Sequence, residues 1–499
     1  MKRIAWIAAG LTFLAHLVAN PHYGFFRDEL YFIVCGRHPA WGYVDQPPLV
    51  PLIAAGSQLF GLSLVALRAT AALFAAAGVF VTCRLVEEWG GRRYAQAFAA
   101  LLVAVTPVLC AFGEKVGPDM VGLWLWPLAA LYVARLVNGA HPRWWLAVGA
   151  ALGVSCEAKY SVIFFGLALV AGIALSPSRR ILLTPWFAAG IALAAVVALP
   201  NFLWQAAHGF PMWELLRDAQ LTGKNVVLSP PAYVAQELLI TNPLLAPIWI
   251  IGVIRAFADT RLRWVGWTYV LLIAMMIALH GKHYYPANVY PLLIASGALT
   301  LAQWTRHLTW ARFTIATAAA VFSLWMLPLV EPILSEARAA SYETTLERVL
   351  HTSAATEKHR PVAIGQDFAD MHGWPQLAAL VARVYRSLPP SERAQAAIVA
   401  SNYGEAAAID VFGSAYHLPP ALSGHNNYWL WGTHGYSGNV VIDVNGDCGR
   451  REHLYRSSLR AATFDAPWIM SYEQNIPIML CRGIRMPLAQ LWPRLKDYI

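Results

Sequence analysis

The segment "FFRDELYFIVCGRHPAWGYVDQPPLVPL", residues 25–52, places three acidic side chains, Asp28, Glu29 and Asp45, directly after an apolar run. That run, residues 4–20, is long enough for a helix that crosses a bilayer. It follows a basic N-terminus and lacks a convincing small-residue cleavage site, so we interpret it as a retained first helix and not as a signal peptide. The segment therefore poses the question of what carboxylates do at a membrane surface.

The composition is that of a membrane protein. Of the 499 residues, 58% are hydrophobic and 13% are charged, whereas about a quarter are charged in soluble domains. Apolar runs of about 17–25 residues, enough to cross the hydrocarbon core as helices, recur along the chain. The net charge of +9 falls largely in short loops between these runs, where membrane proteins carry Lys and Arg. We therefore expect a polytopic membrane protein without a nucleic-acid partner.

The basic loops predict the topology. They contain the clusters Arg92/Arg93, Arg179/Arg180, Arg255–Arg263 and Arg306/Arg312. Because Lys and Arg concentrate on the cytoplasmic side, these loops and the N-terminus are expected inside. About eleven spans result, namely residues 4–20, 67–86, 95–112, 119–137, a short hairpin over 144–175 that counts as two, 181–200, 236–254, 265–280, 286–303 and 313–330.

The chain changes character after residue 330. "PQLAALVARVYRSL" predicts an amphipathic helix. Short buried strands are predicted for "PVAIGQ", "AAIVAS", "NVVIDV" and "IPIMLC". We therefore predict an α-helical transmembrane domain over residues 1–330 and an extracytoplasmic soluble α/β domain over 331–499. Cys448 and Cys481 both lie in this second domain, and an oxidising compartment would allow a disulfide between them.

The predicted outer ends of the spans gather ionisable and aromatic residues from distant parts of the chain. Charged groups at membrane depth usually face a cavity and mark a functional path, although outer loops also carry charge simply because they are wet. We predict catalytic roles for Asp28, Glu29 and Asp45. We predict substrate binding by Arg27, Arg37, Lys115, Asp119, Lys159, Lys282, His283, Tyr284 and Tyr285.

The residue types suit a lipid-phosphate substrate. Lys and Arg can bind a phosphate, which we expect of Lys282 with help from Arg27 or Arg37. A nearby carboxylate could take the proton of an acceptor hydroxyl. Asp28 and Glu29 are adjacent and project about 100° apart on a helix, so one is expected to be catalytic while the other holds structure or a cation. Asp and His side chains are available to bind a divalent cation, although no fixed spacing of these residues requires one.

Aromatic residues accompany these charges. Trp41, Tyr43, Tyr284 and Tyr285 could stack on sugar rings. Aromatic belts at the membrane interface explain them equally well.

The order of these motifs resembles GT-C glycosyltransferases of the protein O-mannosyltransferase type and the branch that includes the bacterial lipid A aminoarabinose transferase. In that superfamily an Asp-Glu pair follows the first span, an acidic residue precedes a Pro-Pro-Leu turn, an Asp opens the fourth span, and a basic segment with tyrosines comes late. The matching elements are Asp28-Glu29, Asp45-Gln46-Pro47-Pro48-Leu49, Asp119 and Lys282-His283-Tyr284-Tyr285. The resemblance covers about residues 1–330.

The resemblance implies a hexosyl- or pentosyltransferase of the inner (plasma) membrane. It would move a sugar from a polyprenyl-phosphate donor to lipid A, another envelope glycan, a lipid or a protein at the extracytoplasmic face, with Asp28 as the general base. Gln46 departs from the Lys that the aminoarabinose branch tends to have, which speaks against the same donor contact and the same donor sugar.

Two readings from other classes compete with an enzyme. A flippase or secondary transporter for lipid-linked sugars would also place charges along a membrane path, but they should reach the bilayer centre and often sit in repeated halves. Here the charges cluster at one face and we find no repeat. A purely structural membrane scaffold would leave the outer acidic cluster unexplained.

The topology makes a direct prediction. A reporter fused after Ser335 is expected to be active only outside the cytoplasm, and a reporter fused after Arg180 only inside it, because the basic loops all fall on one side. Fusions with alkaline phosphatase and a cytoplasmic fluorescent protein measure this. Cytoplasmic activity at Ser335 would contradict the placement of both the C-terminal domain and the acidic loop.

Overall fold

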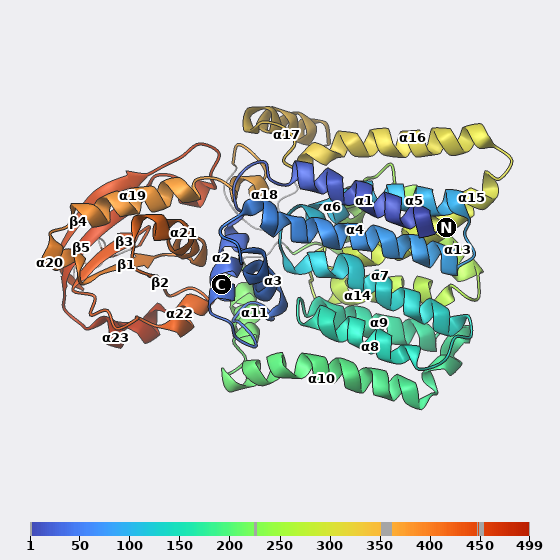
Figure 1. Ribbon diagram of the computed structural model, residues 1–499, viewed down its shortest axis with the longest axis horizontal. Coiled ribbons are helices and arrows are strands. Elements are labelled where there is room, and N and C mark those ends of the chain that lie inside the picture. The colour runs from blue at the N-terminus through green and yellow to red at the C-terminus, as the bar shows by residue number, and fades with distance from the viewer. Residues whose placement is uncertain (1, 224–226, 351–361, 447, 449–453, 499) are drawn as a thin grey trace.

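The computed structural model describes residues 2–223, 227–350, 362–446, 448 and 454–498. They form two lobes (Figure 1). The helical lobe contains the long apolar helices, and the C-terminal lobe contains a β-sheet with helices packed on it. The N-terminus lies at the end of the helical lobe that is remote from the C-terminal lobe (Figure 1).

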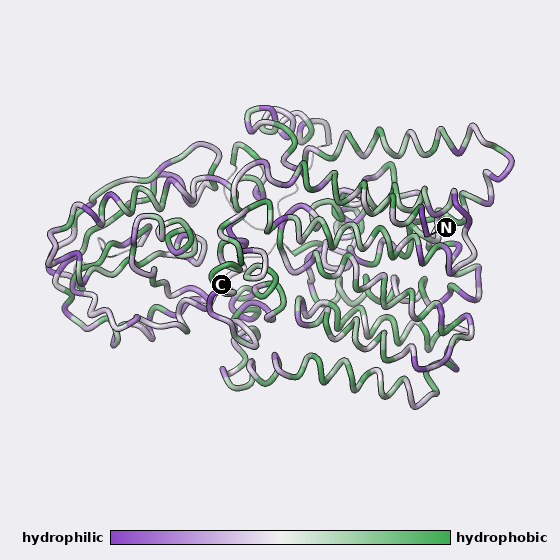
Figure 2. The backbone as a smooth tube through the Cα atoms, viewed as in Figure 1, coloured by the Kyte–Doolittle hydropathy of each residue, from purple (hydrophilic) through white to green (hydrophobic). Residues whose placement is uncertain are grey.

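The helical lobe follows the apolar runs of the sequence. Apolar residues follow the long helices, and hydrophilic stretches lie at the turns between them (Figure 2). Its helices are α1 (Lys2–Ala19), α2 (Arg27–Arg37), α3 (Leu49–Ser57), α4 (Leu64–Glu88), α5 (Arg93–Val105), α6 (Pro107–Glu114), α7 (Pro118–Val137), α8 (Trp144–Cys156), α9 (Ser161–Ala174), α10 (Pro185–Ala207), α11 (Pro211–Leu221), α12 (Pro230–Ile240), α13 (Ala246–Ala258), α14 (Arg263–Ala278), α15 (Tyr290–Trp304) and α16 (Thr309–Met326).

The expected number of about eleven spans is not confirmed. Five helices of the described residues are long and apolar enough to cross a membrane: α1, α4, α7, α10 and α16 extended by its 3-10 turn. The bent pair α5 and α6 could provide a sixth, and α8, α9, α13 and α14 are shorter apolar helices. Several apolar runs fold as shorter pieces than we predicted. The run over residues 236–254, for example, is divided between α12 and α13 by a turn that contains Pro243, which has no N–H to continue a helix.

The predicted span over residues 95–112 is divided into two helices. α5 and α6 meet at 64°. Thr106, the residue between them, is extended (φ −74°, ψ 120°), as the residue before a proline prefers to be, and Pro107 begins α6. The Thr106 hydroxyl donates to the Leu102 carbonyl, 2.6 Å away, and satisfies one of the groups that the break exposes. The bend redirects α6 and thereby carries Glu114 and Lys115 to the site described below.

The first outer segment folds into two short helices. The carboxylate of Glu29 accepts a hydrogen bond from the backbone N–H of Phe26 at 2.9 Å, which caps α2 at its first turn. α2 then crosses α3 at Gly36, where a Cβ atom would lie 2.5 Å from the Pro51 carbonyl oxygen. This close crossing requires glycine, and it lets α2 pack directly on α3.

The C-terminal lobe has a five-stranded mixed sheet in the order β2-β1-β3-β5-β4. β1 pairs parallel with β2 and β3, while β5 pairs antiparallel with β3 and β4. The strands are β1 (Ala396–Ala400), β2 (Ala421–Ser423), β3 (Val440–Val444), β4 (Tyr455–Phe464) and β5 (Ile476–Ile484). The helices are α17 (Glu336–Leu350), α18 (Gln366–Ala369), α19 (Trp374–Ser387), α20 (Pro390–Arg393), α21 (Tyr403–Phe412), α22 (Asn427–Trp431) and α23 (Leu488–Leu491).

Most predicted elements of this lobe are confirmed. "AAIVAS", "NVVIDV" and "IPIMLC" contain β1, β3 and β5, and "PQLAALVARVYRSL" forms most of α19. The predicted strand "PVAIGQ" is wrong for its described residues, which form a loop that leads into α18, and its first residue lies outside the described chain. Ile364 in this loop is nonetheless buried, beside Phe26 and Met371, which explains the strand-like apolar pattern. The division into domains at residue 330 stays a prediction.

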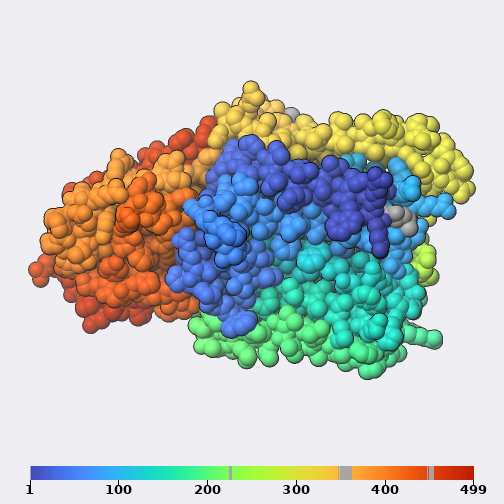
Figure 3. Space-filling model, in the orientation of Figure 1, coloured from blue at the N-terminus to red at the C-terminus, as the bar shows by residue number. Residues whose placement is uncertain are grey.

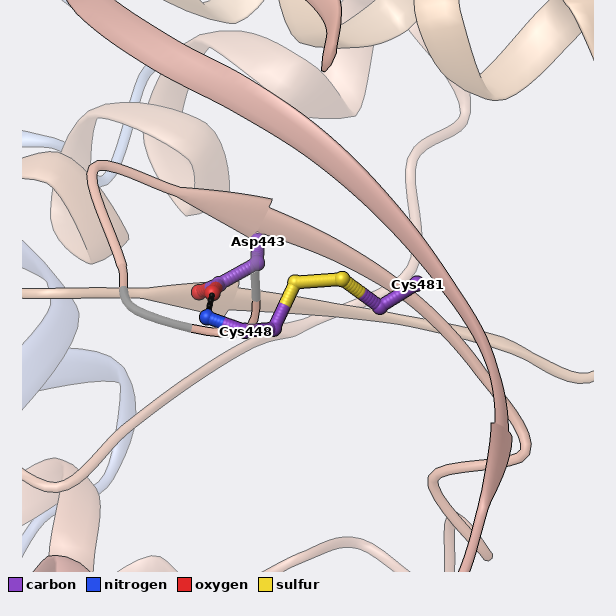
Figure 4. Close-up of a disulfide and its surroundings, with 3 residues drawn as sticks. All are labelled: Asp443, Cys448 and Cys481. Atoms are coloured by element: carbon purple, nitrogen blue, oxygen red, sulfur yellow. Dashed lines mark hydrogen bonds between the residues drawn. A yellow bond between two sulfur atoms is a disulfide. The ribbon is translucent and has the colours of Figure 1, made fainter. Parts of the chain in front are cut away.

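The disulfide between Cys448 and Cys481 is present (Figure 4). Cys481 lies on β5, and Cys448 lies in the loop after β3, where its N–H donates to the carboxylate of Asp443 at 2.8 Å. Cys35, Cys83, Cys110 and Cys156 are free and buried. The bond therefore joins the loop to the neighbouring strand, in a part of the chain that the sequence predicts to face an oxidising compartment.

Removal of this bond should destabilise the C-terminal lobe. The two cysteines are 33 positions apart, and a closed loop of this size corresponds to a loss of about 3–4 kcal/mol when the cross-link is removed. Cys448→Ser is expected to lower the unfolding midpoint of the detergent-solubilised protein and to make it insensitive to reductant. Cys156→Ser serves as the control, and an equal effect of reductant on wild type and Cys448→Ser would contradict the prediction.

Candidate active site

The predicted site residues gather where the helical lobe meets the C-terminal lobe. α2 packs against α21, and the first outer segment lies directly against the C-terminal lobe on the surface (Figures 1 and 3). The buried apolar residues of the two lobes form one continuous cluster that includes Tyr31 on α2 and Ala406 on α21. The lobes are therefore joined by a packed core at this junction.

Glu29 is wholly buried, and both of its carboxylate oxygens accept hydrogen bonds. Its carboxylate accepts hydrogen bonds from the Arg68 guanidinium at 3.0–3.2 Å, and its two oxygens accept from the N–H groups of Phe26 and Val116 at 2.9 Å each. Both Glu29 and Arg68 side chains are 0% exposed. A carboxylate saturated in this way has no oxygen left for a substrate, so we assign Glu29 a structural role.

Arg68 connects four segments of the chain. Its guanidinium donates to the carbonyls of Asn20, at the end of α1, and Gly24, in the first outer segment. It also lies 3.4 Å from the carboxylate of Glu114 at the end of α6. Five donors in a fixed fork allow one arginine to hold several acceptors at once. The sequence analysis missed Arg68, although a charged residue inside the apolar run of α4 is an expensive feature that signals a role.

Asp28 faces the other way, toward the C-terminal lobe. Its Oδ1 accepts a hydrogen bond from the Tyr403 hydroxyl at 2.7 Å and lies 3.5 Å from Nε of Arg27. Its side chain is 36% exposed. Among the described residues no donor is bonded to its Oδ2. Asp28 thus combines a fixed orientation with an oxygen that a substrate can reach.

Arg27 is held by the C-terminal lobe. Its guanidinium donates to the Tyr472 hydroxyl, lies 3.8 Å from Asp370 Oδ1, and stacks over the Tyr403 ring at 5.3 Å. Burial raises the pKa of Asp370 to about 6, even though Arg27 and the Tyr472 hydroxyl favour its ionised form. Arg27 therefore has carboxylate and aromatic partners, and a phosphate would have to share it with them.

Asp45 is also oriented from both lobes. Its carboxylate accepts from the Tyr31 hydroxyl of α2 at 3.1 Å and from the Asn426 amide of the C-terminal lobe at 3.3 Å. The ring of Tyr31 lies 4.8 Å from that of Tyr403, which donates to Asp28. A pair of adjacent tyrosines therefore connects the two predicted catalytic carboxylates.

The backbone around Asp45 is fixed by long-range hydrogen bonds. The carbonyl of Tyr43 accepts from Gln205 of α10 at 2.9 Å, and the N–H of Val44 donates to the Asn427 side chain at 2.6 Å. After the Pro-Pro turn, the N–H of Leu49 donates to the Glu157 carbonyl at the tip of the α8–α9 hairpin, 2.9 Å away. Three distant segments thus hold the loop that carries Asp45.

The predicted cations surround a neighbouring region. Lys115 pairs with Asp367 at 2.9 Å and with Glu114 at 3.1 Å. The side chain of Asp367 is 60% exposed, and the nearby cations outweigh desolvation and lower its pKa. Those cations are Lys115, Arg27 and Lys282. The region therefore brings together positive charges from α2, the α6–α7 turn and the loop after α14.

Asp119 and Lys159 form a second predicted group. They pair at 2.7–2.8 Å, and the Lys159 ammonium lies 4.3 Å from the centre of the Tyr285 ring and 5.3 Å from that of Tyr284. Lys282 approaches the Tyr284 ring at 6.0 Å. Cation–π contacts of this kind order the ammonium groups without neutralising their charge.

Burial and the neighbouring Lys282 lower the pKa of His283 to about 4. Its imidazole is therefore neutral near pH 7, and the positive charge of this loop comes from Lys282.

Other predicted residues have different surroundings. Arg37 is exposed at the end of α2 and donates to the Asp410 carbonyl at 3.2 Å. Tyr43 is buried and its hydroxyl donates to the Cys35 carbonyl at 2.8 Å, so its ring is not exposed for stacking on a sugar. Gln46 is 2% exposed, a position where an uncharged amide costs far less than a lysine would. Trp41 is exposed and remains available for stacking.

Three comparisons with known proteins bear on this arrangement. A family model for dolichyl-phosphate-mannose-protein mannosyltransferases matches residues 45–204. The lipid A galacturonosyltransferase RgtD of Rhizobium johnstonii is 26% identical over 307 residues, which are 58% of this chain and 62% of that protein. The match thus spans less than two thirds of the length of this curated relative.

The structural comparison covers nearly the whole chain. The crystal structure of ArnT from Cupriavidus metallidurans bound to undecaprenyl phosphate superposes with a TM-score of 0.60 at 14% identity, over 96% of this chain and 99% of that one. The apo form of ArnT gives a TM-score of 0.58, over 96% of this chain and 98% of that one. The similarity therefore includes the C-terminal lobe, which the sequence resemblance did not reach.

These findings define an integral membrane protein with the GT-C fold of membrane glycosyltransferases. Within that class the chain resembles the lipid A aminoarabinose transferase branch, which confirms the resemblance read from the first outer segment.

The Arg68 network makes a prediction about stability. Arg68→Met removes the cation from the buried carboxylates Glu29 and Glu114, and an uncompensated buried charge typically costs about 3–5 kcal/mol. Denaturant unfolding in detergent micelles measures the loss. The double variant Arg68→Met/Glu29→Gln should recover part of it, because one of the two carboxylates that lose the Arg68 cation is then neutral. A single variant within about 1 kcal/mol of wild type would contradict the role of Arg68.

Proposed function

We propose that this protein is a glycosyltransferase that uses a polyprenyl-phosphate-linked sugar as donor. It transfers a hexose or pentose to lipid A, another envelope glycan, a lipid or a protein at the extracytoplasmic face of the inner membrane. The observation that carries the proposal is the pair of oriented carboxylates, Asp28 and Asp45, beside a group of cations at the junction of the lobes. The similarity to RgtD and ArnT supports a sugar transfer of this class.

The cations supply positive charge to bind the donor phosphate. Lys282 lies in a loop whose histidine is neutral, its ammonium lies 6.0 Å from the centre of the Tyr284 ring, and it is one of the cations that act on Asp367. Lys115 and Lys159 are paired with Asp367 and Asp119 and add positive charge to the same region. We therefore assign Lys282 the main contact with the donor phosphate, as an ammonium attracts phosphate oxygens from any direction.

Asp28 is the proposed general base. The acceptor hydroxyl gives its proton to Asp28, its oxygen forms a bond to the anomeric carbon of the sugar, and the bond from that carbon to the phosphate oxygen breaks. Polyprenyl phosphate leaves with the electron pair, and the cations stabilise its negative charge. The Tyr403 hydroxyl occupies Oδ1 and thereby turns Oδ2 toward the acceptor.

Asp45 is assigned a positioning role. Its two oxygens already accept from Tyr31 and Asn426, so the carboxylate is better placed to hold a sugar hydroxyl or a cation than to take a proton. Because Tyr31 also packs against Tyr403, a change at Asp45 reaches Asp28 through two aromatic rings. Loss of Asp45 is therefore expected to affect substrate binding and turnover together.

Asp28→Asn is expected to reduce turnover by about 10²–10⁴-fold, the usual contribution of a positioned base. The substitution is conservative in structure, because the amide oxygen of Asn can still accept from Tyr403. Turnover is measured with purified protein, a synthetic polyprenyl-phosphate sugar and acceptor extracted from a strain that lacks this gene. Donor binding and expression should remain near wild type.

Three further variants sharpen this test. Asp45→Asn should give a smaller defect that raises the KM for a substrate or depends on added metal ions. Tyr403→Phe keeps the base but removes its orienting hydrogen bond, and a loss of about tenfold is expected, near 1.4 kcal/mol. Asp465→Asn, an exposed carboxylate of the C-terminal lobe, is the control.

Near-normal turnover of Asp28→Asn would remove Asp28 from the mechanism. If the strain that lacks the gene shows no accumulated polyprenyl-phosphate sugar and no acceptor lacking one sugar, by mass spectrometry of its envelope, the proposed function itself is wrong.

A further inference from the structure

A second group of potential ligands lies in the helical lobe, next to the buried Arg68 network. His16 from α1, Cys110 from α6 and Glu331, two residues after the 3-10 turn Leu327–Leu329, meet there. Their exposed fractions are 6%, 2% and 3%. One ligand atom from each residue lies within 4.8 Å of those of the other two.

The contacts among these side chains are incomplete. His16 Nδ1 lies 3.1 Å from Glu331 Oε1 and 3.2 Å from the Asn20 side-chain oxygen. The Cys110 thiol donates to the Ala104 carbonyl at 3.2 Å, across the bend between α5 and α6. The second oxygen of Glu331 is buried and has no hydrogen-bond partner among the described residues. A simple His–Glu ion pair would leave this oxygen unsatisfied, at a cost of about 1–3 kcal/mol or more for a charged group.

The same group faces a cavity. A space of about 500 Å³ between α1, α5 and α16 is lined almost entirely by apolar side chains. His16, Cys110, Glu331 and Ser323 are the polar exceptions apart from Thr12. The Ser323 hydroxyl is buried and, like the second oxygen of Glu331, has no partner among the described residues. Two unsatisfied oxygens thus line the cavity that borders the imidazole and the thiol.

We propose that His16, Cys110 and Glu331 bind a divalent transition-metal ion with the preferences of zinc. Imidazole, thiolate and carboxylate are the three ligand types that zinc takes in proteins, and ligands at 2.0–2.3 Å in a tetrahedron lie about 3.3–3.8 Å from one another. The 3.1 Å separation of His16 from Glu331 is close to this range. Small side-chain adjustments bring the third ligand to the same spacing, since the limit for all three is 4.8 Å.

The charges of the three ligands favour a divalent cation in these apolar surroundings. A neutral imidazole, one thiolate and one carboxylate together carry two negative charges, which a divalent cation neutralises. Binding releases the thiol proton, as zinc and its relatives bind the thiolate form. The fourth position opens toward the cavity and the Ser323 hydroxyl.

The bound ion would join three segments that are distant in the sequence. α1, the bent α6 and the start of the C-terminal part each contribute one ligand. The Asn20 side chain, which contacts His16, also donates to the Gly113 carbonyl at 2.9 Å, and the Asn20 carbonyl accepts from Arg68. The ion therefore stabilises the arrangement of helices behind Glu29. It takes no part in the sugar transfer proposed above and does not depend on it.

The experiment begins with the unaltered full-length protein. It is purified in detergent without chelators, and its metal content is measured by inductively coupled plasma mass spectrometry. About one zinc ion per chain is expected. After removal of the metal with a chelator, titration with Co²⁺ should produce a thiolate-to-cobalt charge-transfer absorption that saturates at one equivalent. Absence of both the stoichiometric metal and the thiolate absorption would overturn the proposal.

Variants then assign the ligands. Cys110→Ser should lose the charge-transfer absorption, and Glu331→Gln and His16→Gln should each lower the affinity for Co²⁺ at least tenfold. Cys156→Ser, which removes another buried thiol, is the matched control and should behave as wild type. If Cys110→Ser fails to fold, the Co²⁺ spectrum of wild type and the Glu331→Gln affinity still decide the question. An unchanged Co²⁺ spectrum in folded Cys110→Ser would overturn the assignment.

Discussion

The structure depends on the pairing of one buried positive charge. Arg68 lies in an apolar helix with no exposure to solvent, where an unpaired guanidinium would cost several kcal/mol. Its acceptors come from the end of α1, the first outer segment, α2 and α6, so these segments must converge on α4 before the charge is compensated. The geometry of the candidate active site is a consequence of this convergence, because the same segments carry Asp28 and Lys115.

The Arg68–Glu29 pair also gives the adjacent carboxylates of Asp28 and Glu29 different surroundings. Neighbouring residues on a helix point about 100° apart. Once Glu29 is turned into the helical lobe by Arg68, Asp28 must face the C-terminal lobe, where Tyr403 orients it. Glu29 is thereby enclosed while Asp28 keeps an accessible oxygen, and this difference is the basis for proposing Asp28 and not Glu29 as the base.

Sequence patterns predicted what depends on local chemistry and missed what depends on tertiary contacts. Apolar runs and basic loops predicted the helical lobe, and short apolar segments predicted β1, β3 and β5. The bend at Pro107 could have been read from the proline, and Arg68 from its charge in an apolar run. Tyr403 could not, since nothing around it in the sequence shows that it meets Asp28, 375 positions away. The apolar residues around Ile364 were predicted to form a strand, but they are apolar because the loop is buried and not because it pairs in a sheet.

The C-terminal lobe contributes contacts to the candidate site. The resemblance read from the sequence covers only about residues 1–330, yet Tyr403 contacts Asp28, Asn426 contacts Asp45, and Tyr472 contacts Arg27 from the C-terminal lobe. The rings of Tyr31 and Tyr403 then bring these contacts into one packed unit across the junction. Since each carboxylate takes its orientation from both lobes, a shift of the C-terminal lobe would disturb both at once. Under the proposed function, docking of the two lobes would be a condition for the chemistry, because an acceptor at the junction would meet both carboxylates only in the docked form.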